Sequence, residues 1–143
     1  MMSRQGQLAV ALAALAVASS ALAAEPIAAR GAVAILDGDT VDIDGVRIRL
    51  LDIDTPETDR PRCENELTLG LEAKLRLRQL LDAGQVAYVV DGRYRTDRFN
   101  RTLAHVTVAG RDVGAVLLAE GLALVWSPGP KAKAARLAIW CRK

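Results

Sequence analysis

The chain has 143 residues, of which 51% are apolar and 25% are charged. This length supports one hydrophobic core and leaves no room for a second of similar size. Nineteen Lys and Arg residues against 17 Asp and Glu give a formal net charge of +2. So small a net charge excludes any argument from bulk electrostatics for or against a polyanionic partner, and the placement of individual charges must decide.

The first 23 residues have the pattern of a signal peptide. A start with one positive charge, Arg4, is followed by an apolar run at residues 8–18 and by Ala21-Leu22-Ala23, which fits an A-x-A cleavage site. The run is short for a membrane span, and an uncleaved N-terminal anchor is the alternative. We expect cleavage near Ala23/Ala24, a secreted or periplasmic product without a stable membrane span, and a single domain over residues 24–143.

Five segments have the alternation or the apolar character of β-strands: residues 32–36, 40–43, 46–51, 86–90 and 103–108. Asp37-Gly38 and Asp44-Gly45 are typical of the turns that join the first three into a meander.

Three segments are predicted to be helices: residues 64–81, 113–120 and 131–140. Asp112 can cap the second helix, and Gly121 can end it. In the first helix, leucines recur at helical spacing opposite Arg and Lys residues: Leu67, Leu71, Leu75, Leu77, Leu80 and Leu81. The order of elements predicts an α+β fold, a five-stranded OB-type Greek-key β-barrel with a helix inserted after strand three and two short C-terminal helices.

The mature chain contains two cysteines, Cys63 and Cys141. An even pair in an exported chain usually forms a disulfide, and this spacing matches no zinc site. We therefore expect the disulfide Cys63–Cys141, with two buried free thiols as the alternative.

Three carboxylates lie at the ends of predicted strands: Asp39, Asp54 and Glu57. Each taken alone is more typical of a turn or of a solvated rim. If the barrel brings them together, they repel one another and require a cation, and carboxylate oxygens suit Ca²⁺ or Mg²⁺.

Two arginines are placed to reach the same region, Arg49 in the third strand and Arg101 at the end of a charged loop. A guanidinium can hold two phosphate oxygens, although an ordinary surface ion pair is the alternative for either residue. The only histidine, His105, has no partner motif, so a structural or surface role is favoured for it. The base for activating water would then be a carboxylate, and Glu57 is the natural candidate.

Three motifs in order carry a specific resemblance: residues 37–40 (DGDT), 49–57 (RLLDIDTPE) and 97–104 (DRFNRTLA), with a weaker match at 120–123 (EGLA). With these motifs at this spacing, the chain resembles the thermonuclease family, typified by staphylococcal nuclease. The resemblance covers essentially the whole mature chain and implies the same OB-type barrel.

The resemblance implies a cofactor, a substrate and a set of roles. Ca²⁺ would be held by the side chains of Asp39 and Asp54 and by the backbone carbonyl of Thr55. Glu57 would act on the attacking water, and Arg49 and Arg101 would bind the scissile phosphate. The family cleaves both DNA and RNA and leaves 3′-phosphates, and we expect a monomer.

One feature of the third strand requires an irregularity. Strict alternation places Arg49 and Asp54 on opposite faces, since five residues separate them. A single site therefore predicts that the strand ends or bulges near Asp52. Asp52 itself is either a hydrogen-bonded turn residue or an additional acid near the metal.

The chain departs from the usual family pattern at several positions. Asn100 replaces a glycine and tolerates a left-handed backbone, and Phe99 replaces a tyrosine. Trp126 either stacks on a base or packs in the core. Residues 60–63 replace a lysine-rich loop, and the arginine-rich loop at 93–101 has either a nucleic-acid role or a solvated one.

The alternative function is a non-catalytic OB-fold module of nuclease ancestry that binds nucleic acid. Such a module is expected to lose members of the catalytic set, and this chain retains all of them: Asp39, Arg49, Asp54, Glu57 and Arg101. A structural periplasmic domain with an incidental motif is disfavoured by the ordered spacing.

Overall fold

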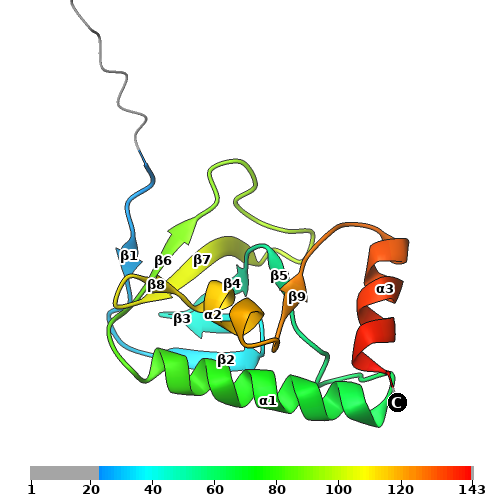
Figure 1. Cartoon of the computed structure of the whole chain (residues 1–143). Coiled ribbons are helices and arrows are strands. Elements are labelled where there is room, and N and C mark those ends of the chain that lie inside the picture. The colour runs from blue at the N-terminus through cyan, green and yellow to red at the C-terminus, as the bar shows by residue number, and fades with distance from the viewer. Residues whose placement is uncertain (1–22, 143) are drawn as a thin grey trace, which may run out of the picture.

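The computed structural model describes residues 23–142 and has an α+β architecture (Figure 1). The predicted signal peptide lies outside these residues, apart from Ala23. All five predicted strands are present within a residue or two of their expected bounds, as are the three helices. The main elements are β2 (Val33–Asp37), β3 (Thr40–Ile43), β4 (Val46–Leu50), α1 (Glu64–Leu81), β6 (Val86–Val90), β7 (Thr102–Val108), α2 (Val113–Ala119) and α3 (Pro130–Trp140). Four two-residue strands were not predicted: β1 (Ile27–Ala28), β5 (Ile53–Asp54), β8 (Arg111–Asp112) and β9 (Leu124–Val125).

The strands pair in the order β1-β6-β7-β4-β3-β2, and every pair is antiparallel except the parallel β4–β7. The two ends of this path, β1 and β2, are consecutive in the chain. Residues 27–37 therefore pair with β6 at one end and with β3 at the other, and the chain itself joins the two edges. The predicted mixed fold with an OB-type arrangement of strands is confirmed.

Tight turns join the strands where the sequence predicts them. Asp44 and Gly45 both have positive φ, 53° and 83°, as a two-residue hairpin of the favoured type requires. Asn100 has φ 59°, which confirms that asparagine adopts the left-handed backbone here.

The core fills the space between the sheet and the helices α1 and α2, and it includes Val41, Ile48, Ile53, Leu77 and Leu117. Figure 1 shows α1 along one side of the strands, and α2 packs against both α1 and β7. The inward-facing residues of β3, β4 and β7 are buried in this core.

The buried face of α1 agrees with the predicted one near its C-terminal end, where Leu77 and Leu81 are buried, and differs from it before that. Leu71 and Leu75 are 52% and 60% exposed. Residue 70 is glycine and residue 73 is alanine. Because these side chains are so small, two other parts of the chain can lie close against this side of the helix: the segment that precedes α1, and the strand β2. The buried stripe of α1 contains two of the predicted leucines and three other residues: Glu66, Gly70, Ala73, Leu77 and Leu81.

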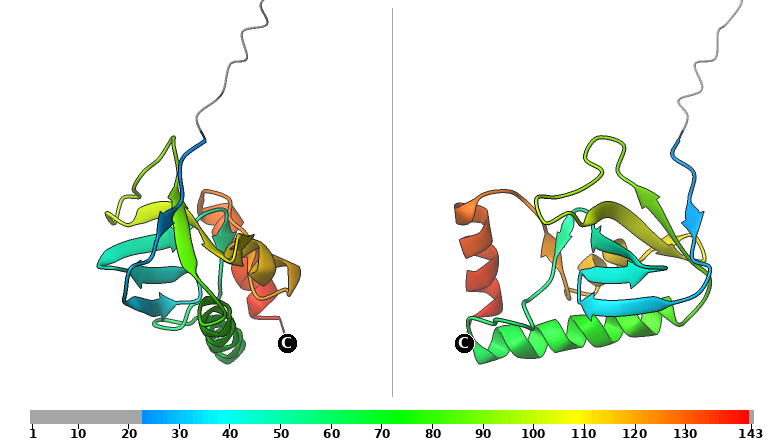
Figure 2. Two further views of the ribbon diagram at one scale, coloured as in Figure 1. Left: turned by 90° about the vertical axis from the view of Figure 1, so that its left-hand side faces the viewer. Right: turned by 180° about the vertical axis from the view of Figure 1, so that it is seen from behind.

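The helix α3 lies beyond the small β5–β9 pair and reaches the beginning of α1 with its C-terminal end (Figures 1 and 2). The disulfide Cys63–Cys141 joins these two ends and confirms the predicted pairing. Asn65 Nδ2 also donates to the carbonyl of Trp140 at 2.6 Å. Within residues 23–142, no helix combines the length and the apolar character needed to cross a membrane.

Candidate functional site

The strand register brings three predicted site residues to one end of the sheet. Thr40 pairs with Arg49 across β3 and β4, and the amide of Leu50 donates to the carbonyl of Asp39 at 2.9 Å. In the parallel pair, Ile48 lies opposite Thr102, the residue after Arg101. Segments far apart in the sequence therefore place Asp39, Arg49 and Arg101 side by side.

A sharp turn adds Asp54 to this group. The strand β4 ends at Leu50, and Asp52 has φ 63°, which confirms the predicted irregularity. The side chain of Asp52 is exposed, and its closest ionic partner is His105, with Oδ2 3.6 Å from Nε2. Asp52 is therefore the turn residue of the two alternatives, and β5 begins after it with Asp54 directed at Arg49.

Arg49 lies between the two aspartates. Its Nη2 is 3.2 Å from Asp39 Oδ2 and 3.0 Å from Asp54 Oδ1. Its Nη1 donates to the carbonyls of Leu50 and Ile53, both at 2.8 Å. The side chain is only 11% exposed, so these bonds form where water screens charge weakly. The two aspartates predicted to bind a cation thus share one guanidinium nitrogen.

Arg101 approaches the same group from the charged loop. Its Nε and Nη2 are both 2.7 Å from Asp97 Oδ2, and its Nη1 donates to Thr40 Oγ1 at 3.4 Å. Thr40 Oγ1 in turn donates to Asp39 Oδ1 at 3.0 Å. The side chain of Arg101 is 26% exposed, more than twice the value for Arg49, so it presents donors to solvent beside the aspartates.

Glu57 lies on the segment between β5 and α1, where it organises its own loop. Its Oε1 accepts the amides of Thr58 and Asp59, both at 3.0 Å. The carboxylate of Glu66 holds the same segment from α1, since it accepts the amides of Glu57 at 3.3 Å and Arg62 at 2.5 Å. Among the described residues, the carboxylate of Glu57 does not form a tight cluster with those of Asp39 and Asp54.

Asp37 is a fourth acid in this region. Burial raises the pKa of its carboxyl to about 6, and the nearby charges of Asp39 and Glu57 act in the same direction. Burial also raises the pKa of Asp54, as does the charge of Asp39, while Arg136 and Arg49 oppose these effects. Acids held together at this cost are typical of a site that accepts a positive charge.

The donor set fits a hard cation. Asp39 and Asp54 offer carboxylate oxygens close together, and Thr55 follows Asp54 directly. The Oγ1 of Thr55 is the one buried side-chain nitrogen or oxygen among the described residues with no hydrogen-bond partner. A Cβ added to Gly38 would lie 2.7 Å from this oxygen, so only glycine admits it so close to the β2–β3 turn. Carboxylate oxygens from two neighbouring acids suit Ca²⁺ or Mg²⁺.

Two further charged residues of the site were missed by the sequence reasoning, Arg136 and Glu66. Both are buried and both bond to site segments, Arg136 through Asp54 and Glu66 through Glu57. Glu66 stands three residues after the helix-capping Cys63, a position where glutamate often reaches back to backbone amides, so its role had a local signal. Arg136 lies one turn before Trp140 on the buried face of α3, but nothing local points to a partner 82 residues away.

Aromatic side chains flank the site with exposed faces. The ring of Phe99 is 4.8 Å from the guanidinium carbon of Arg98 and 5.4 Å from that of Arg101. Trp126 is half-exposed, and its amide donates to the carbonyl of Asp52 at 2.9 Å. Its exposure favours the stacking alternative over a place in the core.

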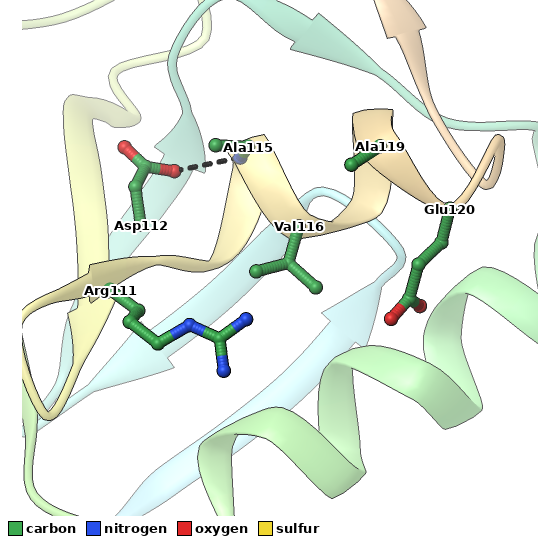
Figure 3. A pocket seen from close by; sticks show the side chains of 6 residues that line it. All are labelled: Arg111, Asp112, Ala115, Val116, Ala119 and Glu120. Atoms are coloured by element: carbon green, nitrogen blue, oxygen red, sulfur yellow. Dashed lines mark hydrogen bonds between the residues drawn. The ribbon is translucent and has the colours of Figure 1, made fainter.

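His105 takes a structural role away from the aspartates of the site. Its Nδ1 is 2.7 Å from Asp112 Oδ2, and the other oxygen of Asp112 caps α2 through the amide of Ala115 at 3.0 Å. Figure 3 shows this cap at the edge of a surface pocket formed by β8 and α2. No predicted site residue lines that pocket. Its acidic member Glu120 is held by Arg76 of α1, with two contacts of 2.7 Å.

Comparisons with known proteins identify the family of the chain. Residues 47–142, more than half of the chain, match the family described as staphylococcal nuclease homologue. The chain is 34% identical over 126 residues to "Endonuclease YncB" of Bacillus subtilis (strain 168), covering 75% of this chain and 59% of that protein. It is 35% identical over 128 residues to "SPbeta prophage-derived endonuclease YokF" of the same strain, covering 75% of this chain and 42% of that protein. The chain thus spans about half the length of these relatives, and it belongs to the staphylococcal nuclease homologue family.

Proposed function

We propose that this protein is an exported, Ca²⁺-dependent endonuclease that hydrolyses phosphodiester bonds in DNA and RNA and leaves 3′-phosphates. The observation that carries the proposal is that Asp39 and Asp54 both contact Nη2 of Arg49. Arg101 lies beside this group and donates to Thr40. Family membership supports it, as do two relatives whose names describe endonucleases.

Each residue has a role that its environment permits. Asp39, Asp54 and the carbonyl of Thr55 would hold Ca²⁺, which when bound supplies a Lewis acid for the negative charge on the phosphate. Arg101, the more exposed arginine, contacts the phosphate oxygens with Arg49 behind it. Glu57 accepts a proton from water as the water oxygen bonds to phosphorus. The bond from phosphorus to the 5′-oxygen breaks, and this oxygen takes up a proton from solvent, which leaves a 3′-phosphate and a 5′-hydroxyl.

The decisive experiment is digestion of single- and double-stranded DNA and RNA with and without a chelator. Glu57→Gln should lower kcat, and Asp59→Asn is its matched control because Asp59 is a solvent-exposed carboxylate of the same loop. Products should resist extension by a polymerase until a phosphatase removes the 3′-phosphate. Activity that persists in chelator, or an unchanged kcat in Glu57→Gln, would contradict the mechanism.

The binding-module alternative has its own outcome in the same assay. A non-catalytic module would retain nucleic acid in a mobility-shift experiment and release no products with any cation. Retention of all five catalytic-set residues favours the enzyme, as does the proximity of four of them, Asp39, Arg49, Asp54 and Arg101.

Export is proposed from the N-terminal apolar segment and from the Cys63–Cys141 disulfide, which is typical of oxidising compartments. Fractionation of cells that produce the full chain, with N-terminal sequencing of the product, tests it. A cytoplasmic product that retains residue 1 would contradict it.

A further inference from the structure

Arg136 is a charged residue enclosed by protein. Its side chain is 8% exposed, and it extends from α3 toward the β5–β9 pair. A buried guanidinium is costly unless its donors are matched, and here two of its three nitrogens donate to oxygens of the chain. Nε donates to Asp54 Oδ2 at 2.7 Å, and Nη1 donates to the carbonyl of Ser127 at 3.1 Å and to its Oγ at 3.4 Å.

This contact assigns the two oxygens of Asp54 to different arginines. Oδ2 is bonded to Arg136, whereas Oδ1 faces Arg49 Nη2, the nitrogen that also contacts Asp39. Rotation of the Asp54 carboxylate would break two charge-assisted hydrogen bonds, which are about twice as strong as neutral ones. Oδ1 is therefore kept on the side of Asp39.

The helix that carries Arg136 is itself fixed in place. Cys141, five residues later, is bonded to Cys63 at the start of α1, and the Trp140 carbonyl accepts from Asn65. Ser127, in the segment between β9 and α3, accepts a hydrogen bond from Arg136 through its backbone carbonyl. The disulfide thus links α3, which carries Arg136, to α1. In α1, Glu66 holds the loop that contains Glu57.

We propose that Arg136 is a positioning residue that acts through Asp54, holding Oδ1 toward Asp39 so that both carboxylates can bind one cation. This inference rests on the proposed Ca²⁺ site, and it assigns to α3 a function in that site. It predicts that replacing Arg136 weakens Ca²⁺ binding, and the direction of this change distinguishes a positioning role from a purely electrostatic one. A positive charge beside the site repels Ca²⁺, so a purely electrostatic role would make binding tighter when Arg136 is replaced by a neutral residue.

The test is Ca²⁺ affinity, measured by isothermal titration calorimetry on the oxidised protein without substrate. Arg136→Met removes charge and hydrogen bonds, while Arg136→Lys keeps the charge but cannot bond Asp54 and Ser127 with the same planar geometry. Both variants should bind Ca²⁺ about 10–100-fold more weakly than the wild type, the usual effect of removing a partner of a metal ligand. Arg76→Met is the matched control, because it breaks the paired contact with Glu120 far from the aspartates and should leave Ca²⁺ affinity unchanged.

The outcomes separate this inference from the proposed function. Unchanged or tighter Ca²⁺ binding in both Arg136 variants, with a wild type that binds, would overturn the positioning role alone. A wild type that binds no Ca²⁺ would overturn the proposed site and this inference with it. Circular dichroism identifies the folded variants, and if Arg136→Met does not fold, the charge-preserving Arg136→Lys decides.

Discussion

Gly70 lies in the middle of α1, where replacement by alanine would normally stabilise the protein. Alanine is favoured over glycine in a helix interior by about 1 kcal/mol. At this position, however, an added Cβ would lie 2.7 Å from the carbonyl oxygen of Pro56 and 2.8 Å from Thr58 Cγ2. The Glu57 carbonyl is 3.2 Å away. Two of the three neighbours are backbone atoms, so the segment that carries Glu57 must move.

The magnitudes predict a reversal of sign. Overpacking of a close contact costs about 1–3 kcal/mol, which exceeds the gain in helix propensity. We expect Gly70→Ala to lower the free energy of unfolding by about 1 kcal/mol and to lower kcat by about 10–100-fold, because misplacement of a reacting group by 1 Å has effects of that size.

Urea unfolding in chelator measures the first effect, and initial rates with saturating DNA and Ca²⁺ measure the second. The pair Glu72→Gly and Glu72→Ala, at an exposed position of the same helix, gives the propensity difference without the contact. If Gly70→Ala stabilised the protein by as much as that pair differs, with kcat unchanged, the close approach of the Glu57 segment to α1 would be refuted.

Three further predictions concern charge, the disulfide and pH. Arg101→Ala should lower kcat by about 100–1,000-fold, the usual effect of losing one donor to a transition-state oxyanion, whereas Arg98→Ala in the same loop should leave kcat within a few-fold; equal effects on kcat would contradict the assignment. Replacement of Cys63 and Cys141 by serine should lower the free energy of unfolding by about 4 kcal/mol, because the loop that the disulfide closes spans a separation of 78 residues. Urea unfolding measures this change, and a loss of less than about 1 kcal/mol would argue against the expectation. The pKa of Asp37 is raised by burial to about 6, so its contribution to stability is complete below its ordinary pKa of 3.8 and is lost as pH rises through 6. In chelator, Asp37→Asn should therefore gain stability relative to the wild type between pH 4.5 and 7.5, by about 1 kcal/mol after allowance for solvent screening, and a difference that does not change with pH would disprove the linkage.

The helix and strand boundaries were predictable because they depend on residues that are close together in the sequence. The helix α1 begins at Glu64 and ends at Leu81, as its periodicity indicates. The positive φ of Asp52 follows from a geometric requirement, since Arg49 and Asp54 can meet only if the strand is interrupted.

The buried face of α1 was not predictable in this way. Six leucines indicated one stripe, but the contacts of the helix are with a loop that needs Gly70 and Ala73, and with backbone amides that need Glu66. Hydrophobicity identifies which residues prefer burial, yet it does not show where a close backbone approach or a buried carboxylate takes precedence. Arg136 was missed for a related reason, because its partner Asp54 is distant in sequence and only the disulfide suggested that α3 returns to the site.

The arginines around the aspartates divide by exposure, and the division has a chemical meaning. Arg49 and Arg136 are nearly enclosed and bond to carboxylates and carbonyls of the chain, so their charges balance acids that would otherwise repel one another. Arg101 is tied to Asp97 and Thr40 but keeps a quarter of its side chain exposed. In the proposed mechanism, a cation that bound these oxygens of Asp39 and Asp54 would displace Arg49 Nη2 and leave it available to a phosphate. The two enclosed arginines would then hold the aspartates for the cation, and the exposed Arg101 would meet the substrate first.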